Sequence, residues 1–263
     1  MKLHYRKVGQ GKPLIILHGL FGSVDNWNTL AKEFSAQNQV FVVDQRNHGL
    51  SPHDAVFSYE AMSNDLLELL NDNNIENANF IGHSMGGKVM MQFASEHSYR
   101  INKMIVVDIS PRYYKPHHQA VLKALHSINF DEISTRRQAE EILNPLLNDI
   151  STTQFLLKNI YWIDDIINGL ELKKLAWRFN LKAISSQIEN VGTESPKPIA
   201  LDAEKLQVLF IKGENSNYII DDDKRLIRNY YPNAVIKTIA NAGHWVQAEQ
   251  PKEFFNTVIK FLK

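Results

Sequence analysis

The stretch Asn79-Phe-Ile-Gly-His-Ser-Met-Gly-Gly-Lys-Val-Met-Met91 has the pattern of a short buried strand that turns sharply into a helix, with Ser84 at the turn. Residues 82–86 match Gly-x-Ser-x-Gly, the nucleophile elbow, in which the glycines permit a tight bend and keep other side chains away from the serine hydroxyl. The start of the following helix directs backbone N–H groups toward any negative charge that forms beside this hydroxyl. The motif is short, so the rest of the chain must support it.

Composition excludes several classes of function. The chain has 263 residues, and its 29 basic and 29 acidic residues cancel to a formal net charge of zero. This balance does not favour nucleic acid or an anionic membrane surface as a partner. The absence of cysteine excludes disulfides, thiolate metal sites and a cysteine nucleophile. A serine, threonine, lysine or carboxylate nucleophile remains possible.

The distribution of apolar residues predicts the location of the protein. The first eight residues alternate polar and apolar side chains like an edge strand, without the long apolar segment of a signal peptide. No apolar run reaches the ~20 residues that a membrane span needs. We therefore expect a cytoplasmic protein without integral membrane association, acting as a monomer or homodimer on a small-molecule substrate.

Apolar runs that alternate with amphipathic helices predict the fold class. Pro13–Leu17 and Lys103–Val107 have the pattern of strands buried on both faces, and Tyr59–Leu70 has the spacing of an amphipathic helix. This alternation predicts an α/β fold with a mostly parallel central sheet flanked by helices, and with chemistry in the loops after the strand C-termini. Further strands are expected at 1–8, 40–43, 80–81, 206–211 and 235–239, and further helices at 25–34, 85–97, 221–231 and 251–262.

The pattern changes between Pro111 and Pro198. Apolar residues have helical spacing there and no segment is a convincing strand, which predicts a helical insertion resting over the strand ends as a lid. The sequence thus divides into a core of residues 1–111 and 201–263 and a cap of residues 112–200. The helices of the cap are expected at 119–128, 137–147, 152–168 and 171–188.

A serine nucleophile needs a base that accepts its proton, and His244 is the candidate. Proteins with this elbow carry the nucleophile, the acid and the base in the order Ser, Asp or Glu, His. Of the histidines after Ser84, only His244 lies in a loop that follows a core strand, within Asn241-Ala-Gly-His-Trp245. A surface loop histidine is the alternative interpretation.

The acid that orients the base is harder to identify. It commonly follows the strand after the insertion, but Ser216 stands where an aspartate is expected. Asp108 follows the strand after the elbow helix, at a rigid strand end from which a carboxylate can reach the same imidazole. We therefore predict Asp108 as the acid, with Glu214 and Asp221 as alternatives. A capping role for Asp108 before Ser110-Pro111 also remains open.

Two backbone amides are predicted to form the oxyanion hole. Met85 follows the nucleophile, and Leu20 lies in the loop after an early strand, so their N–H groups can both face the reacting carbonyl oxygen. His18 precedes the serine in the chain and is expected to brace this loop.

Other aromatic and histidine residues carry weaker signals. Phe21 and Trp245 are candidates for the substrate pocket, although an isolated aromatic residue more often fills the core. His117-His118 does not indicate a metal site, because adjacent residues on a helix diverge by about 100° and no further ligand stands at a suitable spacing. We expect no metal and no organic cofactor.

With these residues in place, the chain resembles the α/β-hydrolase superfamily over nearly its whole length. The motifs that carry the resemblance are His18-Gly, Asp44-x-Arg46-x-His48-Gly49-x-Ser51, Gly82-His-Ser-Met-Gly-Gly87 and Ala242-Gly-His-Trp245. More narrowly, the chain is similar to YbfF-type bacterial esterases and their mitochondrial relatives through segments 18–23, 46–51, 107–111, 154–157, 177–180 and 215–216.

This resemblance implies a serine hydrolase that cleaves carboxylic esters or thioesters through an acyl-enzyme with a Ser-His-Asp triad, with acyl-CoA as a candidate substrate. In that group the acid matches the position of Asp108. The sequence departs from the group at Glu214, where a glycine is usual, and over 161–176, which is longer, so substrate choice is left open. Alternative interpretations are C–C bond hydrolysis, a cofactor-free peroxidase activity, or ligand sensing on a hydrolase scaffold.

Overall fold

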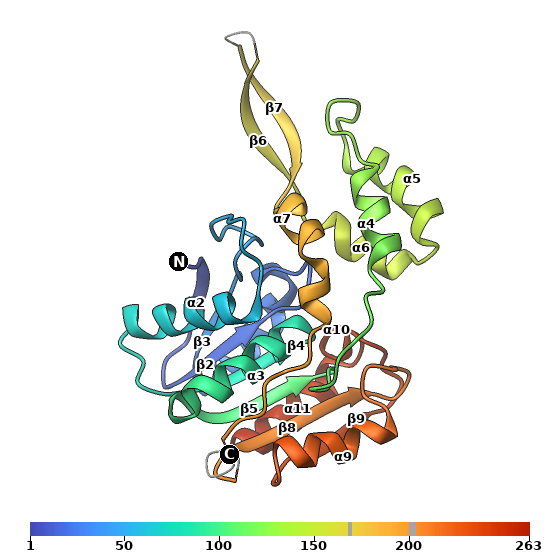
Figure 1. The fold of residues 1–263 in the computed structure, drawn as a ribbon. Coiled ribbons are helices and arrows are strands. Elements are labelled where there is room, and N and C mark those ends of the chain that lie inside the picture. The colour runs from blue at the N-terminus through green and yellow to red at the C-terminus, as the bar shows by residue number, and fades with distance from the viewer. Residues whose placement is uncertain (168–169, 200–203) are drawn as a thin grey trace.

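A seven-stranded sheet forms the centre of the molecule, with strand order β1-β3-β2-β4-β5-β8-β9. The computed structural model describes residues 1–167, 170–199 and 204–263 (Figure 1). Within this seven-stranded sheet, β1 runs antiparallel to β3, and the other pairings are parallel. The strands are β1 (Tyr5–Val8), β2 (Lys12–Leu17), β3 (Asn38–Val43), β4 (Ala78–His83), β5 (Ile101–Val107), β8 (Gln207–Gly213) and β9 (Val235–Ile239).

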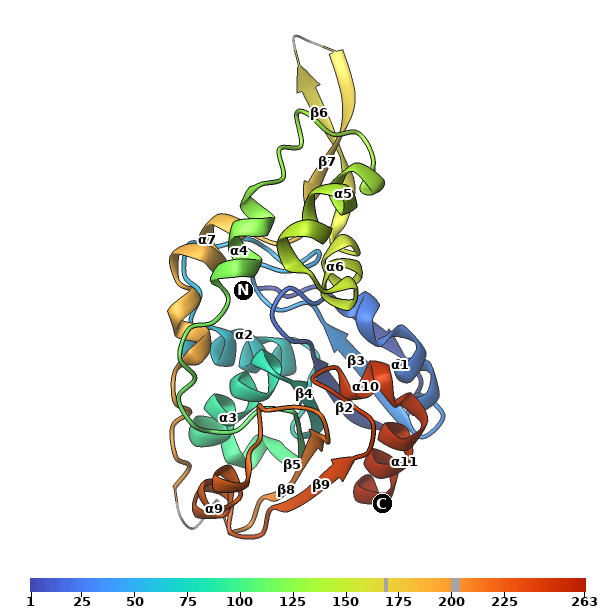
Figure 2. The same ribbon diagram turned by 90° about the vertical axis from the view of Figure 1, so that its right-hand side faces the viewer.

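Helices cover both faces of this sheet (Figures 1 and 2). Within β5, Met104 and Val106 join the apolar cluster that packs against α2, α3 and α9, whereas Ile105 and Val107 join the cluster formed with α1 and α11. Burying each such side chain contributes about 1.5–3 kcal/mol. The bounds are α1 (Asn28–Phe34), α2 (Tyr59–Asp72), α3 (Met85–His97), α9 (Asp221–Tyr230), α10 (Val246–Glu249) and α11 (Pro251–Leu262), with short 3₁₀ helices η1 (Val24–Trp27) and η2 (Ser98–Arg100).

This architecture confirms the predicted fold class. The predicted core strands and helices are all present, with bounds that differ by a few residues, and the expected helix at 25–34 is divided into η1 and α1. Because β2, β4, β5, β8 and β9 run parallel, their carboxyl ends meet at one edge of the sheet. Loops from distant parts of the chain are thereby brought together at this edge.

The segment between β5 and β8 forms a cap over these carboxyl ends (Figures 1 and 2). Seven buried apolar residues form a cluster of its own, contributed by its helices and its two strands. The predicted borders of the cap at 112 and 200 remain predictions, and residues 200–203 lie outside the described residues. The elements of the cap are α4 (Gln119–His126), α5 (Arg136–Leu147), α6 (Ile150–Leu157), β6 (Ile160–Ile167), β7 (Leu170–Trp177), α7 (Leu181–Ser186) and the 3₁₀ helix η3 (Ile188–Gly192).

The prediction that the cap contains only helices is wrong. Strands β6 and β7 pair antiparallel from Ile160↔Trp177 to Ile167↔Leu170, and their ribbon projects away from the core (Figure 1). The run Ile160-Tyr-Trp-Ile163 is rich in β-branched and aromatic residues, which pack better on a pleated sheet than in a helix. The helices expected at 152–168 and 171–188 are accordingly replaced by α6, β6, β7, α7 and η3.

A buried lysine ties both ends of the cap to the core. Lys88 of α3 is 1% exposed, and its Nζ donates hydrogen bonds to the carbonyl oxygens of Pro111, Arg112 and Thr193 at 3.0, 2.7 and 2.8 Å. Residues 111 and 112 lead into the cap and residue 193 leads out of it. The elbow helix therefore carries the anchor of the cap.

Among the described residues, no helix combines the length and the apolar character that crossing a bilayer requires.

Candidate active site

Ser84 stands between β4 and α3 in a strained backbone conformation. Its φ of 51° and ψ of −115° lie in a region that non-glycine residues rarely adopt. The bend needs its glycines, because a Cβ on Gly82 would lie 2.5 Å from the carbonyl oxygen of Gly86, and one on Gly86 would lie 2.6 Å from that of Leu17. The N–H of Ser84 donates to the carbonyl oxygen of Val107 at 2.9 Å, which fixes the turn on the neighbouring strand.

His244 and Asp108 lie in a hydrogen-bonded row with this serine. His244 Nε2 is 3.1 Å from Ser84 Oγ, and His244 Nδ1 is 2.8 Å from Asp108 Oδ2. Since a carboxylate accepts hydrogen bonds, Nδ1 carries the imidazole proton and the lone pair of Nε2 faces the serine hydroxyl. The three predicted residues therefore have the geometry that proton abstraction from a serine requires.

Asp108 is fully buried and held by the neighbouring strand. Its N–H donates to the carbonyl oxygen of Ile211 at 2.8 Å, and its Oδ1 accepts a hydrogen bond from the Gly213 N–H at 3.1 Å. The Ser216 hydroxyl donates to Oδ2, the same oxygen that faces His244. The serine that stands in place of the expected aspartate thus contacts Asp108, the predicted acid, on the adjacent strand.

The alternative acids bond elsewhere. Glu214 Oε2 accepts a hydrogen bond from the N–H of Asn241 at 2.9 Å. Asp221 is 90% exposed and pairs with Lys224 at 2.7 Å. The structure therefore brings Asp108, and neither of these carboxylates, to the imidazole.

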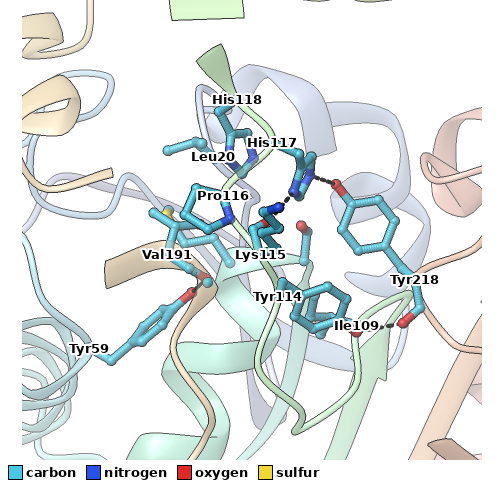
Figure 3. Close-up of a pocket in the computed structure, with 13 residues that line it drawn as sticks. Leu20, Tyr59, Ile109, Tyr114, Lys115, Pro116, His117, His118, Val191 and Tyr218 are labelled. Carbon is cyan, nitrogen blue, oxygen red and sulfur yellow. Dashed lines mark hydrogen bonds between the residues drawn. The ribbon is translucent and has the colours of Figure 1, made fainter. Parts of the chain in front are cut away.

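The two predicted oxyanion amides belong to residues that border the same cavity as Ser84 (Figure 3). Met85 is the first residue of α3, where backbone N–H groups point out of the helix. The loop of Leu20 approaches the serine closely, because a Cβ on Gly19 would lie 3.3 Å from Ser84 Cβ. Both amides are thus placed near the hydroxyl, and their role remains a prediction.

Buried neutral histidines brace the loop of Leu20. Burial lowers the pKa of His18 to about 4 and that of His48 to about 3, so both are uncharged at neutral pH. His18 Nε2 accepts a hydrogen bond from the N–H of Gln45 at 3.1 Å, which leaves Nδ1–H to donate to Gly19 O at 2.8 Å. His48 Nε2 accepts from the N–H of Phe21 at 3.1 Å.

The cavity at Ser84 receives residues from both the core and the cap (Figure 3). Its apolar wall would suit an acyl chain, and none of its lining residues is acidic. In the described part of the chain, no group of three or more histidine and acidic side chains could hold a metal ion. The cavity is lined by Leu20, Tyr59, Ser84, Met85, Ile109, Tyr114, Lys115, Pro116, His117, His118, Val191, Gly192 and Tyr218.

Phe21 and Trp245, the two predicted pocket residues, are not among those that line this cavity. Phe21 is buried, and its ring lies 5.0 Å from that of Phe179. The Trp245 ring lies 5.5 Å from that of Phe155 in the cap. Both therefore pack at the junction between the core and the cap.

Comparison with known proteins agrees with this fold. The model of the alpha/beta hydrolase fold family matches residues 12–251. The chain belongs to this family. Esterase YbfF of Escherichia coli (strain K12) is 36% identical to this hydrolase over 252 residues, which cover 95% of the chain and 92% of that protein. The expected resemblance to YbfF-type esterases is thereby confirmed.

Two further similarities extend over nearly the whole hydrolase. The sn-1-specific diacylglycerol lipase ABHD11 of Danio rerio is 35% identical over 263 residues, covering 97% of this chain and 80% of that protein. The solved structure of a marine microorganism esterase superimposes with a TM-score of 0.92 at 40% identity and covers 99% of both chains. The similarity therefore includes the cap as well as the core.

Sequence reasoning missed the residues of the cavity wall that come from the cap and from the loop after β8. The segment 114–118 and Tyr218 line the same cavity as Ser84, but no motif indicates this. In the sequence, His117-His118 suggests only a metal site, which its spacing does not favour. In the structure the two rings lie 4.2 Å apart, and burial lowers the pKa of His118 to about 4. The adjacent histidines in the predicted insertion were a sequence feature that could have indicated this part of the cavity wall.

Proposed function

We propose that this hydrolase cleaves carboxylic esters and thioesters through an acyl-enzyme formed on Ser84. The chain is a carboxylic ester hydrolase. Relatives named as an esterase and a lipase match nearly its whole length, as does the solved esterase structure. The hydrogen bonds that connect Ser84, His244 and Asp108, with Ser84 in the wall of a cavity, are the observation that carries the proposal.

Acylation begins when Ser84 Oγ attacks the substrate carbonyl carbon. His244 Nε2 accepts the hydroxyl proton, and Asp108 stabilises the resulting imidazolium through the proton on Nδ1. The N–H groups of Leu20 and Met85 donate to the oxyanion of the tetrahedral intermediate. Each such donor is typically worth about 10²–10³ in kcat.

The intermediate collapses when the imidazolium protonates the leaving alkoxide or thiolate. Water then enters, gives its proton to His244 and attacks the acyl carbonyl, and a second collapse releases the acid and restores Ser84. Because the same steps serve an oxygen or a sulfur leaving group, the triad alone does not select between esters and thioesters.

The residues that line the cavity favour an apolar acyl group. Leu20, Ile109 and Val191 supply an apolar surface, while Lys115 and His117 provide polar groups on the cap side. Acylglycerols and acyl-CoA thioesters are both candidate substrates. Each joins an acyl group to a leaving group that bears polar groups, glycerol in one and the CoA thiol in the other.

A substrate panel with two serine variants tests the proposal. The panel consists of p-nitrophenyl esters from acetate to palmitate, acyl-CoA thioesters of matched length, and a diacylglycerol. Ser84→Ala should lose turnover of every substrate, by up to ~10⁶-fold in kcat, with an unchanged melting temperature. The control position Ser95 lies on the same helix, where its hydroxyl donates to Gln92 O at 2.7 Å, and Ser95→Ala should retain full activity. Substantial turnover by folded Ser84→Ala would contradict the mechanism.

A further inference from the structure

Tyr218 lies directly against the proposed base. Its ring centroid is 3.9 Å from that of the His244 imidazole, and the ring planes differ by 19°. The His83 ring also contacts the imidazole at 4.7 Å, and His83 Nε2 bonds to His244 O at 2.8 Å. Burial raises the pKa of Tyr218 to about 12, so its ring is a neutral phenol at physiological pH.

The loop that carries Tyr218 also holds the proposed acid. Gly213 and Ser216 donate hydrogen bonds to the two oxygens of Asp108. The N–H of Tyr218 lies 3.2 Å from Ser216 Oγ and donates to it. The N–H of Asn215 donates to Ala242 O at 2.8 Å, which fastens this loop to the loop of His244. Tyr218 is therefore fixed relative to the acid and the base together.

The hydroxyl and the carbonyl oxygen of Tyr218 bond to residues of the cap. The Tyr218 hydroxyl is 2.7 Å from His117 Nε2, and Tyr218 O accepts a hydrogen bond from the Tyr114 hydroxyl (Figure 3). His117 Nδ1 faces Lys115 O at 3.1 Å and must donate to it, so in the neutral histidine Nε2 accepts the phenol proton. One side chain thus touches the base on its ring face and the cavity wall at its hydroxyl.

We infer that Tyr218 is a positioning residue: its ring holds the His244 imidazole for proton transfer, and its hydroxyl couples that imidazole to the cap through His117. This inference rests on the proposed function, because it concerns the same base. When His244 becomes an imidazolium during acylation, the facing phenol ring stabilises the charge by a cation–π contact, which is stronger in a partly desolvated site. The link to His117 fixes the segment 114–118 that walls the cavity.

The ring contact is tested by comparing two substitutions at one position. Tyr218→Leu removes the ring and should lower kcat for a p-nitrophenyl ester about tenfold, because the stabilisation acts only when the imidazolium forms. Tyr218→Phe keeps the ring and should restore kcat to within about threefold of wild type. Melting temperatures establish that both variants fold. Equal kcat values for the Leu and Phe variants would overturn the ring role.

The link to the cap is tested by a double-mutant cycle. Tyr218→Phe and His117→Ala should each raise KM about 2–10-fold with little change in kcat, since one hydrogen bond to the cavity wall is lost. The double variant should be no worse than either single variant, because both remove the same contact. Fully additive effects on KM, or an unchanged KM in Tyr218→Phe, would overturn the coupling.

Two matched controls separate this coupling from general effects. His126→Ala removes another cap histidine bonded to a hydroxyl, but its partner, Ser185 at 2.9 Å, also lies in the cap. Tyr5→Phe removes a phenol hydroxyl that is bonded to Asn73 at 2.7 Å. Tyr5 lies on β1, at the edge of the sheet far from β8 and the loop of Tyr218. Both controls should keep wild-type kcat and KM. Turnover that persists in Ser84→Ala would overturn the proposed function. The kcat and KM values of the Tyr218 and His117 variants, all of which keep Ser84, test the role of Tyr218 alone.

Discussion

The core and the cap are stabilised in different ways. In the core, the strands are stabilised by pairing with their neighbours and by two apolar clusters on opposite faces of the sheet. The cap has a small cluster of its own and joins the core partly through polar anchors, including Lys88 to Thr193 O and Asn159 Nδ2 to Phe21 O at 2.8 Å. Apolar residues at its base, such as Leu125 and Ile184, also join one of the core clusters.

This difference separates the chemistry from the shape of the cavity. Ser84, Asp108 and His244 all follow core strands, so the backbone of the core sets their positions. The segment 114–118 and Val191, which wall the cavity, belong to the insertion. We therefore expect substitutions in the core site to remove turnover, and substitutions in the cap to change mainly substrate fit.

After the loss expected for Ser84→Ala, the largest effect is expected at Asp108, the proposed acid. Asp108→Asn keeps the shape of the side chain but no longer fixes the imidazole with its proton on Nδ1, so kcat should fall by up to ~10⁴-fold. Steady-state kinetics on a p-nitrophenyl ester measure this loss. Glu214→Gln and Asp221→Asn serve as comparisons and should retain nearly full activity. An equal loss in either of them, with little loss in Asp108→Asn, would move the acid to the loop after β8.

A second effect concerns stability of the core in acid. His18 and His48 have pKa values of about 4 and about 3 because of burial, whereas in the unfolded chain the value is near 6.5. The unfolded chain therefore binds more protons, and the free energy of unfolding should fall below pH 6.5 by about 1.4 kcal/mol per pH unit for each histidine. Urea unfolding from pH 7.5 to 5 measures this slope.

Histidine variants show whether these buried groups cause the slope. His48→Gln should make it shallower, and the exposed-site control His126→Gln should leave it unchanged. A free energy of unfolding that stays constant between pH 6.5 and 5 would contradict the neutral, buried state of these histidines.

A third, smaller effect is expected at the junction of the core and the cap. Burial lowers the pKa of Lys88 to about 7 from the ordinary 10.5, although its three carbonyl acceptors favour the ammonium. The unfolded chain binds the extra proton above pH 7. The stability of wild type relative to Lys88→Met should therefore rise from pH 7 to 9, by at most about 1.4 kcal/mol per pH unit. Urea unfolding of both proteins at each pH measures the difference between their free energies of unfolding. A difference that stays constant from pH 7 to 9 would contradict the lowered pKa of Lys88.

The smallest effect is expected on the projecting ribbon of the cap. Trp162 of β6 is 54% exposed, so Trp162→Thr should change the free energy of unfolding by no more than about 0.5 kcal/mol. Its kcat/KM should remain within about twofold of wild type. A large loss of activity with intact stability would show that the ribbon takes part in substrate binding, and would weaken the distinction between core and cap.

The sequence predicted the core better than the cap for a physical reason. Strands buried on both faces leave continuous apolar runs, and a parallel sheet brings the residues after its strands to one edge. The elbow at Ser84, the loop of His244 and the strand end at Asp108 could therefore be proposed together. The serine at position 216, where an acid was expected, directed attention to the neighbouring strand.

The cap could not be predicted in the same way. Its short amphipathic segments have spacings that suit a helix or a strand, so β6 and β7 were predicted to be helical. The run Ile160-Tyr-Trp-Ile163, rich in β-branched and aromatic residues, was the sequence signal that favoured a strand. Tyr218 and Lys88 gave no signal, because their roles arise from contacts with the cap that only the folded chain brings together.

The central claim is that Ser84 is the nucleophile, and covalent labelling tests it most directly. The protein is treated with a fluorophosphonate, the residual esterase activity is followed, and the modified peptide is identified by mass spectrometry. The account predicts one adduct per chain, on Ser84, with inactivation in proportion to labelling and no adduct in Ser84→Ala. Labelling of another residue that accompanies inactivation, or full activity in the protein labelled at Ser84, would contradict it.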